Sequence, residues 1–127
     1  MLRNLQKQGS VIIADGAAIS GALEIPVGFA LGIIEVPTSW TAADLGFQLS
    51  TDGGTTFVDL YAGSGTTTSR FRLTGIPTGG ASLQLVPGIF EIGLGMQVKL
   101  TSINTASNAD ANQTGAITLG IWVGRVN

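Results

Sequence analysis

The stretch that most constrains the fold is a strand, a glycine turn and a returning strand near the middle of the chain. From Leu45 to Leu49 every second residue is large and apolar, and this period of two is typical of a strand with one face on a core. The turn sequence TDGGT at residues 51–55 follows; its glycines tolerate positive φ, and its aspartate can hydrogen-bond the nearby backbone. On the returning strand we expect Val58 and Leu60 to point inward. A β-hairpin here favours an all-β fold.

Prolines indicate sheet along the rest of the chain, because each follows a β-branched aliphatic residue. Proline cannot donate to a ladder and keeps its predecessor extended, so such pairs mark strand ends or edges. The sequence therefore predicts a single-domain antiparallel β-sandwich, jelly-roll-like, with about eight to nine short strands and no long helix. We expect residues 10–127 to form this domain and residues 1–9 an extended or weakly ordered N-terminal arm. The proline pairs are Ile25-Pro26, Val36-Pro37, Ile76-Pro77 and Val86-Pro87.

The composition excludes several functional classes. Charged residues make up 11% of the chain, against about 25% in an ordinary globular protein. The chain has no cysteine and no histidine, which removes thiol nucleophiles, thiolate metal sites and the commonest general base. A net charge of −2 without a basic patch argues against nucleic-acid binding. No apolar run reaches the length of a membrane span, and the first residues lack a secretory signal, so we expect a protein made in the cytoplasm.

No catalytic, cofactor or metal constellation emerges from the motifs. A glycosidase needs two carboxylates about 5–10 Å apart, and Asp52 and Asp59 flank the hairpin, but any pair across a turn would approach in this way. The close oxygen-ligand spacing of a calcium loop is missing. We therefore predict that the chain is not an enzyme. A surface of Thr, Ser, Gln and Gly is cheap to desolvate, which favours a subunit inside an assembly over an isolated neutral domain.

Aromatic residues supply three candidate interface positions. Trp122 lies on the polar side of the last strand, where it could bind a neighbouring subunit, lie under the N-terminal arm or stack on a sugar; we favour the first two. Trp40 is expected to cover the core above the hairpin, with ligand stacking as the alternative. Tyr61 ends the hairpin and is the third aromatic that could meet a glycan.

Basic residues supply the other candidate interface positions. Arg3 and Lys7 fall in the expected arm, which could reach a neighbouring subunit or simply fray. Arg70 and Arg72 share one face of a strand and could pair with carboxylates of a partner, although we favour an ordinary solvated face.

Several pieces of the chain, in their order, resemble a family of small virion proteins of tailed bacteriophages. Together they touch most of residues 30–122, and no single piece is specific. They are the aliphatic run before Pro37, Trp40-Thr41-x-Ala43, Leu45-Gly46-Phe47-Gln48-Leu49-Ser50 with its Asp52-Gly53-Gly54 turn, Lys99-Leu100-Thr101-Ser102, and Asn112-Gln113 leading into Ile117-Thr118-Leu119.

The resemblance implies a β-sandwich carried on the phage particle, of the capsid decoration or cement type. It implies a homo-oligomer, most often a trimer, whose partner is the major capsid protein of the head, and it brings no catalytic residues. The expected location is therefore the capsid surface of the virion. A phage tail or head-fibre module that binds host-surface glycans is the alternative, and a carbohydrate-binding domain outside any virus is a further one.

Overall fold

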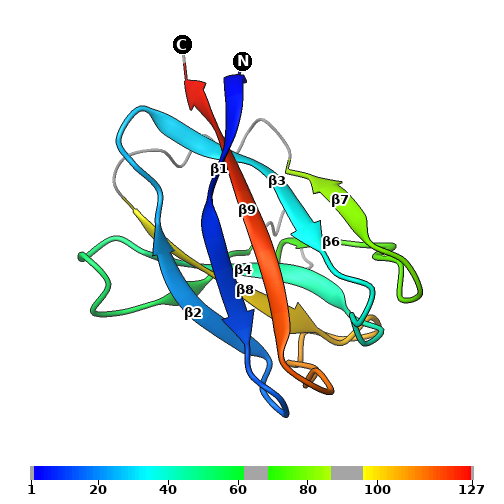
Figure 1. Ribbon diagram of the computed structural model, residues 1–127. Helices are drawn as coiled ribbons and strands as arrows, with labels where there is room; N and C mark the ends of the chain where they lie inside the picture. Colours follow the sequence, from blue (N-terminus) through cyan, green and yellow to red (C-terminus); the bar gives the residue numbers. More distant parts are fainter. Residues whose placement is uncertain (1, 62–68, 87–95, 127) are drawn as a thin grey trace.

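The computed structural model describes residues 2–61, 69–86 and 96–126, and within these ranges the chain forms strands and turns with no helix. Since no helix occurs there, none that could cross a membrane is found in this part of the chain. The all-β prediction is thus confirmed (Figure 1). The strands are β1 (Leu2–Ile13), β2 (Ile19–Glu24), β3 (Phe29–Val36), β4 (Asp44–Ser50), β5 (Val58–Asp59), β6 (Arg72–Leu73), β7 (Ser82–Leu85), β8 (Gln97–Ile103) and β9 (Ile117–Val126).

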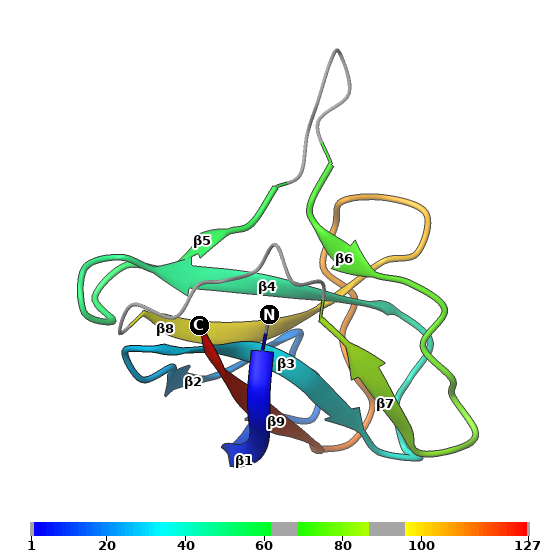
Figure 2. The same ribbon diagram turned by 90° about the horizontal axis from the view of Figure 1, so that it is seen from above.

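The strands form one curled antiparallel sheet whose two halves face each other. One half has the order β1-β9-β3-β7, and the other has β2-β8-β4 with β5 and β6 both paired to β4. The halves join where β1 meets β2 at the Ile13–Ser20 pair. Seen from above, β4 and β8 lie in one layer and β1, β3 and β9 in the other (Figure 2). This interleaving of early and late strands is the order of a jelly roll.

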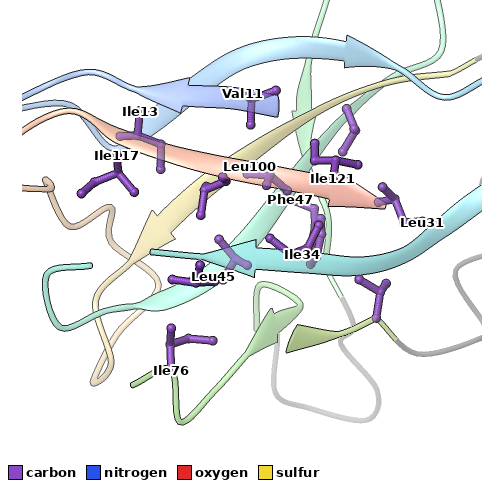
Figure 3. Close-up of a cluster of buried hydrophobic side chains, with 14 of the residues drawn as sticks. Val11, Ile13, Leu31, Ile34, Leu45, Phe47, Ile76, Leu100, Ile117 and Ile121 are labelled. Atoms are coloured by element: carbon purple, nitrogen blue, oxygen red, sulfur yellow. The ribbon is translucent and has the colours of Figure 1, made fainter. Parts of the chain in front are cut away.

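The core lies between the two halves and is built by the alternation that the sequence shows. In β9 the inward residues Ile117, Leu119, Ile121 and Val123 are all fully buried. Leu45, Phe47 and Leu100 reach the same space from the facing half, so the cluster is continuous across the two layers (Figure 3). Burial of each such side chain stabilises the fold by about 1.5–3 kcal/mol. The core therefore fixes which face of each strand remains outside.

The hairpin turn after β4 forms as the sequence predicts. Oδ1 of Asp52 accepts hydrogen bonds from the backbone N–H groups of Thr55 (3.1 Å) and Thr56 (2.9 Å). Gly53 and Gly54 both have positive φ, at 77° and 98°. Val58 lies opposite Leu49 and so on the core side of the sheet, as predicted, but it is 64% exposed and not buried. It belongs to the two-residue strand β5 at the end of the sheet, where no facing strand covers it.

The N-terminal segment is not a loose arm. Residues 2–9 are the first part of the 12-residue strand β1, which pairs with β9 from Leu2–Val126 to Ile13–Ile117. The register shifts between Arg3 and Gln6 and again between Lys7 and Gly9. Such bulges break the period-two alternation that marks a strand in sequence, which explains why this strand was predicted as an arm.

Candidate interaction surface

The outer side of the β1-β9-β3-β7 half carries a group of apolar side chains that the core leaves uncovered. Strand pairing brings them into rows: Lys7 lies opposite Trp122, Trp122 opposite Ile33, and Ile33 opposite Leu85. Residues directly opposite each other in antiparallel strands share a face. The four strands lie side by side in this order in Figure 1. We call the following residues the outer face: Leu5, Lys7, Ile33, Glu35, Leu83, Leu85 and Trp122.

Three leucines of the outer face are largely open to solvent. Leu5 is 44% exposed, Leu83 67% and Leu85 75%. Trp122 is half-buried, and it lines an apolar hollow of about 200 Å³ together with Leu5, Ile33 and Leu83. Contiguous apolar groups on a surface mark protein or ligand contacts more often than isolated ones do. This hollow can therefore receive an apolar side chain from a partner.

A polar contact runs through the middle of the outer face. The indole Nε1–H of Trp122 donates to Oε1 of Glu35, and the Lys7 ammonium lies 3.5 Å from the same oxygen. The hydrogen bond from Trp122, and then the charge of Lys7, hold the pKa of the Glu35 carboxyl below its usual value. Glu35 is thus ionised at neutral pH and fixes the orientation of the Trp122 ring.

A second depression adjoins this contact. It has a volume of about 350 Å³, and its lining includes Lys7, Glu35, Ser82, Leu83 and Thr118. Its charged members are already paired with each other, so it presents little free charge to a ligand.

Arg70 does not lie on a solvated face, and it pairs with carboxylates of its own chain. Its side chain is 3% exposed and binds Asp110 at 2.6 Å and Asp59 at 3.1 Å. It also donates to Oγ1 of Thr101 (3.1 Å) and to the backbone oxygen of Asn108 (3.2 Å). These bonds attach the segment 104–110 to the β4-β8 half. Arg70 is therefore a buried structural residue, which corrects its assignment to an interface.

Arg72, two residues further along the chain, also donates hydrogen bonds to the segment 104–110. Its Nη1 donates to Oδ2 of Asp44 at 3.3 Å and to the backbone oxygens of Asn104 (2.9 Å) and Ser107 (3.0 Å). Its side chain is 14% exposed, so only a small part of it reaches the surface. The prediction of an interface arginine is wrong here as well.

The remaining predicted interface residues lie in different parts of the molecule. Trp40 is 2% exposed and donates from Nε1 to the Ala43 carbonyl at 3.1 Å, so it is the core residue that we preferred and cannot meet a partner. Tyr61 is 48% exposed and pairs with Arg70 in the other half of the sheet. Arg3 lies opposite Arg125 at the far end of β1. Of the seven predicted residues, Trp122 and Lys7 meet on the outer face.

Sequence reasoning missed five members of the outer face, namely Leu5, Ile33, Glu35, Leu83 and Leu85. One signal was present: β3 is apolar on both faces except at Glu35, which indicates a strand covered on both sides. The others depend on register. Leu5 lies within the first register shift of β1, between Arg3 and Gln6, and the pairing of β7 with β3 follows from the fold and not from any local pattern.

Among the residues that the structure describes, no group of three or more acidic, histidine or cysteine side chains is placed to hold a metal ion. Comparison of the chain with protein-family models, with curated proteins and with solved structures gave no match.

Proposed function

We propose that this protein is a non-enzymatic structural subunit of a virion, a capsid decoration or cement protein that binds the major capsid protein of a tailed-phage head. The observation that carries the proposal is the outer face, where exposed leucines surround a half-buried Trp122 and the two charges pair with each other. Interface centres have this character: aromatic and apolar anchors with few free charges. The resemblance to phage virion proteins supplies the identity of the partner.

The carboxylates of the chain support a structural role because most of them are engaged in holding the fold. An acid or base catalyst needs a carboxylate that is free to approach a substrate. Six of the eight in the sequence instead accept hydrogen bonds within the chain: Asp15, Glu35, Asp44, Asp52, Asp59 and Asp110.

The glycan-binding alternative has less support from the geometry. Trp122 and Tyr61 lie in opposite halves of the sheet, and Trp40 is buried, so these three aromatics make no common platform. The hollow beside Trp122 is lined by Leu5, Ile33 and Leu83, which offer no hydrogen bonds to sugar hydroxyls. Jelly rolls serve both capsid and lectin proteins, so the fold itself does not decide between these functions.

Binding to phage head shells tests the proposal. Purified protein is added to heads that lack it and is sedimented with them. We expect Leu5→Lys to weaken binding at least about tenfold, because a charge at the apolar centre of an interface must be desolvated. Val58→Lys is the matched control, since Val58 is 64% exposed but lies in the other half of the sheet. Unchanged binding of Leu5→Lys, or no binding of the wild type to heads, would overturn the proposal.

A further inference from the structure

We propose that β7 is a self-pairing edge, through which two copies of this chain join their β1-β9-β3-β7 halves into one continuous sheet across a twofold axis at Gln84. The pairing concerns two free molecules and goes beyond the proposed attachment to a capsid. It gives a dimer, in contrast to the trimer that the resemblance to phage proteins implies.

β7 ends the sheet order, so one of its edges has no strand partner among the described residues. Its orientation follows from the hydrogen bond that Val86 N–H donates to the Gly32 carbonyl of β3 at 2.9 Å. In an antiparallel ladder the backbone groups of alternate residues point to the same neighbour. Gln84 therefore points its N–H and C=O to β3, as Val86 does. Leu83 and Leu85 point theirs to the open edge.

Among the described residues, this edge lacks the features that keep sheet edges apart. Monomeric proteins protect such edges with charges, bulges or coverage. No charged residue occurs from Leu73 to Val86, and the register of β7 with β3 is regular. The opposite end of the sheet differs, because β5 contains Asp59 and β6 contains Arg72. Within the part of the chain that the structure describes, the β7 end can approach a copy of itself without placing like charges together.

The sequence of β7 is complementary to itself in one register. A twofold axis at Gln84 places Leu83 of each copy opposite Leu85 of the other. The two residues with outward N–H and C=O groups then face each other and exchange backbone hydrogen bonds. Their side chains also share the outer face, so the exposed leucines of both copies meet in one apolar cluster. Gln84 lies opposite its own copy, where each amide can both donate and accept.

The size of the contact sets its strength. A stable interface usually buries more than about 1,000 Å², and pairing of a four-residue strand falls below this. We therefore expect a weak dimer, with a Kd of roughly 10⁻⁵ to 10⁻⁴ M. The joined sheet carries two outer faces side by side, so a lattice that binds one can bind both, which raises the avidity.

The first test is light scattering coupled to size-exclusion chromatography of the purified protein, over concentrations from roughly 10 µM to 1 mM that bracket this Kd. We expect the mass to rise from 13.0 kDa toward twice that value. Leu83→Lys/Leu85→Lys places like charges opposite each other and should weaken the dimer at least about tenfold. Leu83→Lys/Leu85→Glu places opposite charges together in the proposed register and should retain it. Leu5→Lys changes the same outer face away from the edge and should also retain it.

A wild type that stays monomeric, or that forms a trimer, would overturn the proposal. Equal weakening by the two double variants would refute the register, and weakening by Leu5→Lys would place the contact elsewhere on the outer face. Gln84→Cys gives a second measurement, because the chain has no cysteine of its own. Opposed residues of a non-hydrogen-bonded pair lie close enough for a disulfide. Oxidation should therefore cross-link Gln84→Cys into dimers and leave Gly79→Cys monomeric, and the reverse pattern would contradict the pairing.

Discussion

Arg70 offers the sharpest test of how the fold is held together. The change Arg70→Met keeps most of the aliphatic length and removes a guanidinium that is 3% exposed. Breaking a buried ion pair costs about 3–5 kcal/mol when the partner stays buried and unpaired. Here the partner carboxylates of Asp59 and Asp110 are 31% and 45% exposed, so water can partly replace the lost donors. Thr101 is fully buried and loses its bond outright. We therefore expect a loss of about 3 kcal/mol in the free energy of unfolding.

Urea unfolding at pH 7, followed by tryptophan fluorescence, measures this loss. With an m value of about 2 kcal/mol/M, the midpoint should fall by about 1.5 M. Arg125→Met is the control, because Arg125 is exposed and its cation lies 5.5 Å from the Phe29 ring, a contact expected to contribute less than about 1 kcal/mol. A loss below about 1 kcal/mol for Arg70→Met would refute the view that this arginine locks the 104–110 segment to the sheet.

Two further predictions concern the packing of β4 and the polar contact of the outer face. Gly46→Ala should lower the free energy of unfolding by about 2–3 kcal/mol in the same assay, because a Cβ there would lie 2.2 Å from Cδ1 of Ile103. Gly21→Ala, where no atom lies within 4 Å, should change it little, and equal effects would contradict the packing. The hydrogen bond from Trp122 lowers the pKa of the Glu35 carboxyl from its usual 4.5. The ionised carboxylate therefore contributes fully to the stability of the fold above pH 4.5, and this contribution is lost as the pH falls through the lowered pKa. The stability difference between wild type and Glu35→Gln, measured by urea unfolding from neutral to acidic pH, should therefore shrink on acidification, and a constant difference would contradict this.

The strands whose alternation is uninterrupted were predictable from the sequence. The inward residues of β9 and the turn at Asp52 follow from local rules, because each needs only its neighbours in the chain. The first part of β1, residues 2–9, escaped prediction because two register shifts interrupt its alternation. Val58 lies on the core side of the sheet, but its exposure was not predicted, because burial depends on whether another strand covers the residue, which no local pattern records.

The candidate site was only partly predictable, for the same reason. Trp122 was placed on the outward side of the last strand from the alternation of that strand, and in the structure it lies half-buried opposite Lys7 on the outer face. The arginines could not be placed, because their partners Asp44, Asp59 and Asp110 come from other strands and loops. Leu83 and Leu85 look like ordinary core residues until the pairing of β7 turns them outward. The resemblance to phage virion proteins stays a prediction about the partner.

Cryo-electron microscopy of the phage virions to which the proposed function assigns this chain tests the central claim most directly. We predict density for this jelly roll on the outside of the head, with Trp122 and its surrounding leucines turned toward another protein subunit. Virions that lack the chain, or that carry it only on the tail, or head density in which this side faces open solvent, would contradict the account.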